Sequence, residues 1–178
     1  LTLAITYTAA MLILCPIGAY VGSIVVRGIM ALYNAVGPIT LGLFAAVLPY
    51  MIMTGMHTGV GSFMVQMLSE QGYDPIFRPA LLLHNMSEGG AMLGIAIRAK
   101  NKELKTQAIS LAVTCIFAGV TEPTIYGFTL PLKKPLFAVS AGGAVGGLIA
   151  GLLKCHSYEM GYSTILALPI FQDTMGKM

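Results

Sequence analysis

The stretch that decides the fold is TQAISLAVTCIFAGVTEPTIYGFTLPL, residues 106–132, which follows Lys105 and precedes Lys133 and Lys134. Glu122 is its one charged residue. Segments rich in Lys and Arg lie on the cytoplasmic side of a membrane, so we expect both ends there. A single span would separate the ends, and two full spans of about 20 residues each would not fit. The pattern therefore predicts a re-entrant hairpin.

The tip of this hairpin is expected at residues 119–123, Gly-Val-Thr-Glu-Pro, because Gly and Pro interrupt a helix there. Residues 106–118 would rise about 20 Å as a helix, which places the tip deep in a hydrocarbon core about 30 Å thick. Irregular backbone at that depth is tolerated only inside protein or beside a water-filled cavity. The hairpin therefore implies a cavity with Glu122 at its wall.

The composition of the 178 residues agrees with a membrane protein. Charged residues make up 10%, against about 25% in soluble proteins, while hydrophobic residues reach 56% and glycine adds 21 residues. So little charge cannot cover a soluble surface, and the absence of a large basic block excludes a nucleic-acid partner. We expect an all-α integral membrane protein with transmembrane helices, a re-entrant hairpin and an interfacial amphipathic helix.

Charge-free runs, Gly, Pro and charge clusters divide the rest of the chain. They predict a truncated span in residues 1–14, an interfacial helix at 19–36, a main span at about 38–54 followed by an irregular segment, an exposed loop at 70–78, an apolar piece at 79–97, a cytoplasmic basic loop at 98–105, a span at 135–153, and a loop with a short apolar piece at 154–178. On the span at 135–153, Gly143, Gly147 and Gly151 form a small-residue ridge that predicts close helix packing. Both ends of the chain are expected to be truncated.

The cysteines and the known short motifs add little chemistry. Cys15, Cys115 and Cys155 are odd in number and lack paired spacing, so we expect buried free thiols. Motifs for metalloproteases, nucleotide binding and serine hydrolases do not occur in the sequence. We therefore expect no metal and no cofactor.

Glu122 is the first candidate for a functional role, because an ionised carboxylate inside a membrane is costly and indicates function. Its two oxygens could accept hydrogen bonds from two hydroxyls of one ligand; the alternatives are a structural ion pair and a shallow loop acid. His57 is the second candidate, as a donor, acceptor or proton carrier, unless it only packs between helices. The stretch 84–90, His-Asn-Met-Ser-Glu-Gly-Gly, is third, either as contacts to a polyol or as a polar helix start.

Several motifs resemble those of the enzyme IIC membrane domain of bacterial phosphotransferase-system sugar permeases. Residues 119–127, Gly-Val-Thr-Glu-Pro-Thr-Ile-Tyr-Gly, are similar to the signature G-[IV]-T-E-P-x-[IL]-[YF]-G of that family. Residues 85–91, the basic run 100–105 and Gly55-Met56-His57 are similar to further family segments. The resemblance covers nearly the whole chain, residues 1–178, as the C-terminal part of the domain, and it is nearest to the beta-glucoside, sucrose and trehalose branch.

The resemblance implies a multi-pass protein of the bacterial inner membrane that carries a sugar and releases it phosphorylated. A phosphocysteine on a separate enzyme IIB domain would supply the phosphoryl group, which makes the chain a component of a phosphotransferase. It further implies that Glu122 and Thr121 bind sugar hydroxyls, with Asn85 and Glu88 as further substrate contacts, and that His57 lies near the reacting hydroxyl. His57 and Glu122 are the catalytic candidates. A homodimer in the lipid bilayer, with a mobile substrate-carrying half, is also implied.

Three departures from the family pattern bear on these expectations. Thr58 replaces the usual Trp after the histidine, Glu88 replaces the usual Gln, and no cysteine has the context of an enzyme IIB site. Two other functions remain open: a proton-coupled carrier in which Glu122 and His57 form a relay, and a structural or haem-bearing subunit that uses His57 and His84.

Overall fold

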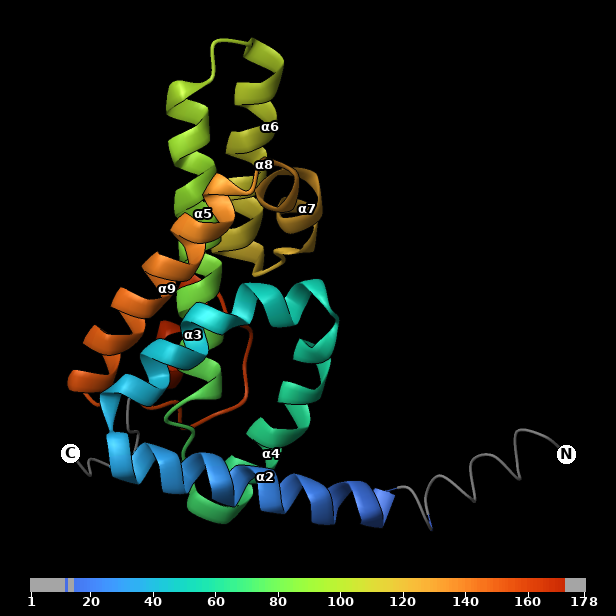
Figure 1. Cartoon of the computed structure of the whole chain (residues 1–178), viewed down its shortest axis with the longest axis vertical. Helices are drawn as coiled ribbons and strands as arrows, with labels where there is room; N and C mark the ends of the chain where they lie inside the picture. The colour runs from blue at the N-terminus through green and yellow to red at the C-terminus, as the bar shows by residue number, and fades with distance from the viewer. Residues whose placement is uncertain (1–11, 13–14, 172–178) are drawn as a thin grey trace, which may run out of the picture.

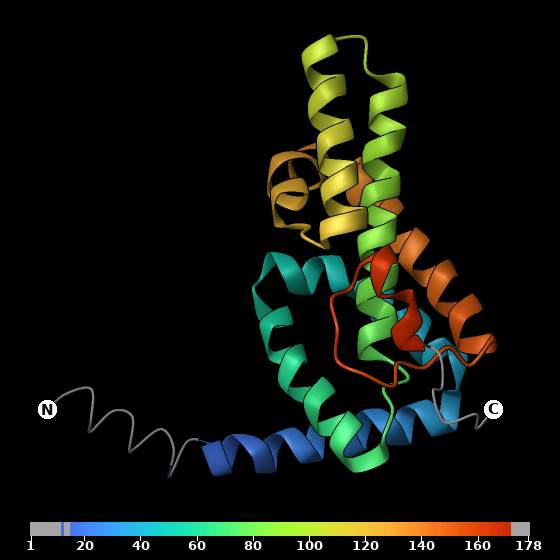
Figure 2. The same ribbon diagram turned by 180° about the vertical axis from the view of Figure 1, so that it is seen from behind.

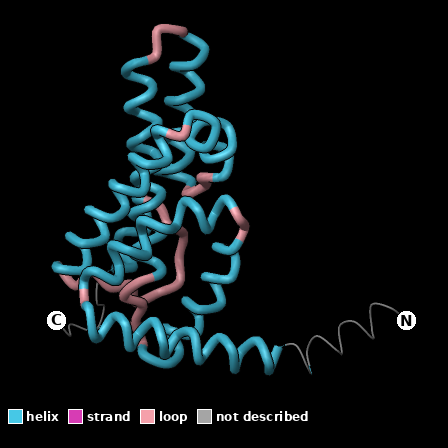
Figure 3. Tube along the Cα trace, in the orientation of Figure 1, coloured by secondary structure: helices cyan, strands magenta, loops and turns pink. Residues whose placement is uncertain are grey.

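The computed structural model describes residue 12 and residues 15–171, and within these residues the chain is helical without a strand (Figure 3). A single antiparallel bridge pairs Asp74 with Ser157. The prediction of an all-α fold is therefore confirmed. The truncated span predicted for residues 1–14 lies, apart from residue 12, outside the described residues.

The described residues form short and long helical elements. In chain order they are α2 (Cys15–Val36), α3 (Pro38–Met53), η2 (Met56–Gly59), α4 (Val60–Gln71), α5 (Phe77–Arg98), α6 (Lys102–Val113), η3 (Thr114–Ala118), α7 (Glu122–Thr124), η4 (Ile125–Thr129), α8 (Leu130–Leu132), α9 (Lys134–Leu152) and η5 (Ile165–Phe171). Of these, η2 and η5 are 3₁₀ helices, and η3 and η4 are π-helical turns.

α5 is the central helix of the molecule. It contacts α3, α9 and α6, and α3 and α9 also pack on each other. α5 and α6 run antiparallel and extend together at one end of the molecule, whereas α2 lies across the other end (Figures 1 and 2). The short elements α7 and α8 lie beside α6, so residues 102–132 form one hairpin-like unit against α5.

The predicted ridge of Gly143, Gly147 and Gly151 packs against α3. A Cβ atom at Gly147 would lie 2.7 Å from the Cα atom of Gly42, and one at Gly151 would lie 2.7 Å from the Cα atom of Pro38. These distances are shorter than a carbon–carbon contact of about 3.5 Å. Only glycine therefore allows the two backbones to approach this closely, and the packing prediction is confirmed.

A second row of glycines on α9 faces α5. A Cβ atom at Gly142 would lie 3.1 Å from the Oγ atom of Ser87, and one at Gly146 would lie 3.1 Å from the Cδ2 atom of Leu83. α9 is thus packed between α3 and α5. Among the described residues, α9 is the one unbroken helix that is long and apolar enough to cross a membrane.

The prediction of an irregular segment after residue 54 is wrong for most of its length. Gly55, at a φ of 75°, ends α3, and after η2 the chain forms α4, so the axis bends by 119°. α4 continues to Gly72, which ends it at a φ of 79°. The helix forms because good helix formers follow the glycines, and because its Met64 and Met67 are buried in a core cluster that includes Phe77.

The prediction of an exposed loop at residues 70–78 is also wrong, because Asp74 is buried there. Its carboxylate accepts hydrogen bonds from the backbone N–H groups of Ile76, Phe77 and Arg78, at 2.9, 2.9 and 2.7 Å. These bonds satisfy free N–H groups at the start of α5. Burial raises the pKa of Asp74, while the N–H groups and the Arg78 guanidinium act in the opposite direction. Charge and proline marked a turn here, but the turn packs inward.

The cysteine predictions hold for one of the three residues. Cys115 is a buried free thiol. Cys155 is free but only partly buried, because it lies in the loop after α9. The side chain of Cys15 is outside the described part of the structure.

Candidate functional site

The candidate site lies where two breaks in the helices meet. One break separates α3 from α4 and carries His57, and the other separates η3 from α7 and carries Glu122. The Nε2 atom of His57 lies 3.5 Å from the Oε1 atom of Glu122. The His57 side chain is 24% exposed and that of Glu122 is 48% exposed. The two leading sequence candidates are therefore neighbours, on a surface that a solute can reach.

The break that carries Glu122 follows from the local sequence. Asn101 caps the start of α6, where its side chain accepts a hydrogen bond from the backbone N–H of Glu103 at 2.8 Å. Gly119, at a φ of 73°, ends η3, as glycine commonly ends a helix. Pro123 then lies in the first turn of α7, where its missing N–H is no loss. The side chain of Glu122 is thereby held at the start of a new helical turn.

π-helical turns lie on both sides of this break. η3 precedes it and η4 follows it after α7. Such turns are rare and occur often at functional sites. Thr121 and Thr124 are buried at this break, whereas Glu122 between them in the sequence is exposed.

Asn85 fastens the tip to two other segments. Its Nδ2 atom donates to the backbone oxygen of Gly119 at 3.3 Å and to that of Ser163 at 2.6 Å. A Cβ atom at Gly119 would lie 2.8 Å from the Cγ2 atom of Thr164. The loop after α9 therefore closes over the tip, with the buried Asn85 amide at the junction.

Two further polar side chains of α5, His84 and Glu88, are fully buried. Thr129 donates a hydrogen bond to the Oε1 atom of Glu88 at 3.4 Å. Within residues 15–171 neither the other oxygen of Glu88 nor either ring nitrogen of His84 has a hydrogen-bond partner. In the same range, no three His, Cys, Asp or Glu side chains are placed to hold a metal ion.

Sequence reasoning missed two residues that shape the site. The hydroxyl of Tyr126 donates to the backbone oxygens of Ile52 and Met53 at 3.5 and 3.3 Å, which joins the second break to the end of α3. The backbone oxygen of Ser163 accepts a hydrogen bond from Asn85. The Ser163 hydroxyl accepts another from the guanidinium of Arg78 at 3.1 Å. Tyr126 could have been found from its place in the quoted motif. Ser163 carries no local signal, because its role depends on a loop that folds back.

The chain is similar to a known protein family and to several of its individual members. The family model described as "Phosphotransferase system, EIIC" matches residues 1–144. The chain is 34% identical over 157 residues to the "PTS system beta-glucoside-specific EIIBCA component" of Bacillus subtilis (strain 168), which covers 88% of this chain and 26% of the relative. It is 31% identical over 169 residues to the "PTS system arbutin-, cellobiose-, and salicin-specific EIIBC component" of Escherichia coli (strain K12), which covers 95% of this chain and 35% of the relative.

More distant relatives carry other names. The "PTS system N-acetylmuramic acid-specific EIIBC component" of Escherichia coli O157:H7 is 29% identical over 184 residues, with 99% of this chain and 38% of the relative covered. The chain thus spans roughly a quarter to two fifths of the length of these relatives. No solved structure gives a significant match.

Proposed function

Since this chain belongs to the phosphotransferase-system EIIC family, in the branch of the beta-glucoside relatives, we propose that it forms the substrate-binding part of a sugar permease. It carries a beta-glucoside or a disaccharide across the bacterial inner membrane, coupled to phosphorylation of the sugar. The observation that carries the proposal is the pairing of His57 with Glu122 where two helix breaks meet. A carboxylate accepts hydrogen bonds from two hydroxyls, and an imidazole can donate or accept, so the pair suits a polyol.

In this proposal residues 106–132 enter the membrane from the cytoplasmic side as a re-entrant hairpin, with the tip at residues 119–123. The bent pair α3–α4 is a second re-entrant unit whose tip carries His57. Irregular backbone at membrane depth requires a cavity or protein around it, and broken helices that meet at the midplane are a common design of transport sites. The 119° bend and the His57–Glu122 contact support this arrangement.

The protein is multi-pass, and α2 lies in the membrane interface. α2 carries Ile17, Ile24 and Leu32, each at least half exposed, together with the exposed Arg27. A helix with an exposed apolar surface and a nearby cation suits the boundary between headgroups and acyl chains. From the family resemblance, we also propose that two copies of the protein form a homodimer.

Glu122 and His57 contact the sugar directly, because their side chains are accessible. Thr121, Asn85 and Glu88 complete the binding site from beneath the tip. All three are buried in this structure, so a sugar reaches them only when the tip moves away from α5. Such a movement would break the hydrogen bond from Asn85 to Gly119 and separate the tip from the loop after α9.

The phosphoryl donor is the phosphocysteine of an enzyme IIB domain, consistent with the EIIBC and EIIBCA names of the relatives. A sugar hydroxyl attacks the phosphorus atom, the phosphorus–sulfur bond breaks, and the sulfur leaves as a thiolate. Glu122 or His57 accepts the hydroxyl proton. Their larger contribution is to orient the hydroxyl, because phosphoryl transfer depends mainly on positioning and electrostatics.

A proton-coupled carrier is the second candidate, since the same 3.5 Å contact between His57 and Glu122 would suit a proton relay. The two functions respond differently to energy sources. A proton-coupled carrier stops when the proton gradient is collapsed, whereas a phosphotransferase permease stops when the phosphoryl donor is removed.

Uptake by the full-length protein tests the proposal. Cells that express it are given a panel of labelled beta-glucosides that includes arbutin, cellobiose and salicin. We expect uptake of at least one sugar, its recovery as a phosphate ester, loss of uptake without phosphoenolpyruvate, and little effect of an uncoupler. Accumulation of unmodified sugar that collapses with the uncoupler would overturn the proposal in favour of the proton-coupled carrier.

A further inference from the structure

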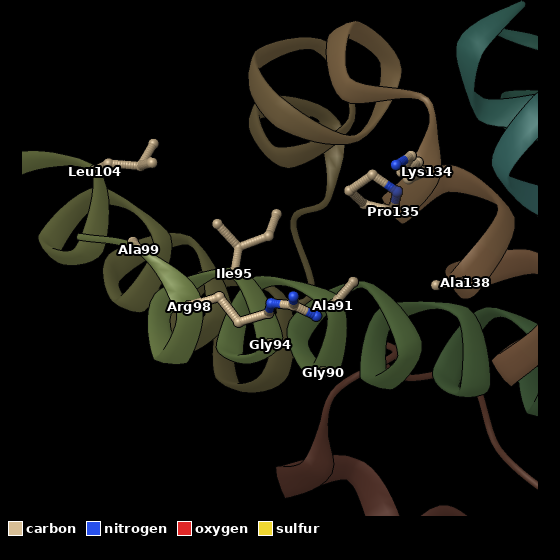
Figure 4. Close-up of a pocket in the computed structure, with 10 residues that line it drawn as sticks. All are labelled: Gly90, Ala91, Gly94, Ile95, Arg98, Ala99, Leu104, Lys134, Pro135 and Ala138. Carbon is tan, nitrogen blue, oxygen red and sulfur yellow. The ribbon is translucent and has the colours of Figure 1, made fainter. Parts of the chain in front are cut away.

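A groove far from the His57–Glu122 pair lies between α5 and the first turn of α9, with α6 beside it (Figure 4). Its volume is about 610 Å³. The wall on α5 is made of Gly90, Ala91 and Gly94, and that on α9 of Pro135 and Ala138. Small and apolar side chains therefore leave a furrow along two packed helices.

Two cationic side chains, Arg98 and Lys134, line this groove. Arg98 reaches it from the last turn of α5, and Lys134 from the first turn of α9 (Figure 4). Both residues are exposed, and within residues 15–171 neither side chain has a hydrogen bond or an ion pair. No Asp or Glu is among the described residues that line the groove. Its positive charge is therefore available to an anion from outside the described chain.

The furrow is open at its glycines. A Cβ atom at Gly90 or at Gly94 would meet no atom within 4 Å, in contrast to the tightly packed glycines of α9. The helix surface next to the furrow is apolar and exposed, with Ile97 at 82% and Phe137 at 67%. The open glycines leave room for a flexible hydrocarbon chain, which would lie alongside the Arg98 side chain (Figure 4).

We propose that this groove binds an anionic phospholipid, with its headgroup phosphate at Arg98 and Lys134 and one acyl chain along Gly90, Gly94 and Ala138. Two cations that line an apolar furrow match a phosphate joined to a hydrocarbon chain. Basic pockets between membrane helices on the cytoplasmic side recognise anionic headgroups in this way. Arg can also hold a phosphate through two parallel N–H···O bonds. The site is separate from sugar recognition and depends only on the membrane setting of the domain.

The test uses the full-length protein in a mild detergent, titrated with phosphatidylglycerol, with phosphatidylcholine, or with glycerol phosphate. Native mass spectrometry counts the bound molecules. We expect preferential binding of phosphatidylglycerol, and a fall in affinity of about 20-fold in the double variant Arg98→Gln/Lys134→Gln, since each cation near a membrane surface contributes about a fivefold change. The matched control is Lys102→Gln/Lys105→Gln, which removes two charges from the same basic loop outside the groove.

A second variant tests the acyl-chain half. Gly94→Leu fills the furrow without a clash, and we expect it to weaken phosphatidylglycerol binding at least fivefold, while Gly28→Leu, at another open glycine, leaves binding unchanged. Equal binding by the charge variant and its control, or normal binding by Gly94→Leu, would overturn the proposal. Equal affinity for glycerol phosphate would show a free-anion site instead. Absence of bound lipid in the wild type would show that another segment fills the groove, and would also overturn it.

Discussion

α3 and α9 pack backbone against backbone, whereas the two helix breaks at His57 and Glu122 meet through side-chain contacts. At the first, Gly147 would place a Cβ atom 2.7 Å from Gly42, so backbone lies on backbone along the ridge. At the second, the 3.5 Å contact of His57 with Glu122 and the hydrogen bonds from Tyr126 to the end of α3 join the breaks, and the side chains of His57 and Glu122 are partly exposed. Close-packed interiors resist deformation, whereas segments with few buried contacts open at low cost. The molecule therefore presents Glu122, the carboxylate of the proposed sugar site, on its less constrained part.

The largest expected effect is on ligand binding, from Glu122→Gln. The substitution keeps the shape of the side chain but removes the charge and one acceptor oxygen. Hydrogen bonds to charged groups contribute about 1.5–3 kcal/mol each, so losing one and weakening the other to a neutral hydrogen bond lowers sugar affinity about a hundredfold. Isothermal titration with the best sugar from the uptake panel measures this loss.

Glu103→Gln is the matched control, because it makes the same chemical change on the exposed first turn of α6. It should bind sugar as the wild type does, and both variants should unfold at the wild-type temperature. Unchanged binding of every sugar by Glu122→Gln would remove this residue from the proposed site.

The next effect is on stability, from Gly147→Leu. A side chain here would overlap the backbone of Gly42 and Leu41, and overpacking of this kind typically costs about 1–3 kcal/mol or more. We expect a lower unfolding temperature of the full-length protein in detergent, with sugar affinity preserved in the folded fraction. Gly28→Leu, where the added atoms meet open space, should leave the temperature unchanged. Equal temperatures for the two variants would contradict the account of the ridge.

The smallest effect is expected from Asn85→Asp, which links the two regions. Asp has the shape of Asn but lacks the Nδ2 donor that holds Gly119 and Ser163. Burial keeps this Asp protonated, so it can donate to only one of the two oxygens, and loss of the other bond costs about 1–2 kcal/mol. We expect roughly tenfold weaker sugar binding and faster hydrogen exchange at residues 119–121. Asn101→Asp, where the side chain only accepts a bond, serves as the control. Normal exchange at the tip in Asn85→Asp would show that Asn85 does not hold it.

Much of the fold could be predicted from local features of the sequence. The low charge content indicated a membrane protein, and glycine and proline marked the ends of α3 and the break before Glu122. The spacing of Gly143, Gly147 and Gly151 predicted a close helix contact, because residues four apart lie on one helix face. Its partner, α3, could not be predicted, since that depends on the arrangement of helices far apart in the chain.

The errors arose where a local signal was overruled by packing. The segment after residue 54 was expected to be irregular because Gly55, Gly59 and Gly61 interrupt it, yet apolar side chains of α4 pack in a core that includes Phe77. Asp74 was expected at the surface because it is charged, yet three backbone N–H groups at the start of α5 hold it inside. The N–H groups that bind Asp74 are close to it in the chain, but whether this turn faces solvent or the core depends on how α5 packs against the rest of the molecule.

The sequence by itself determined that this chain is a helical membrane domain, which chemical groups it can offer, and where its helices break, because composition, glycine and proline act locally. The tertiary structure alone decided that the break at His57 meets the break at Glu122, that Asn85 and Ser163 close the tip, and that Arg98 and Lys134 share a groove. Those encounters join residues far apart in the chain, and they follow from how α5 and α9 pack, which no short stretch of sequence encodes.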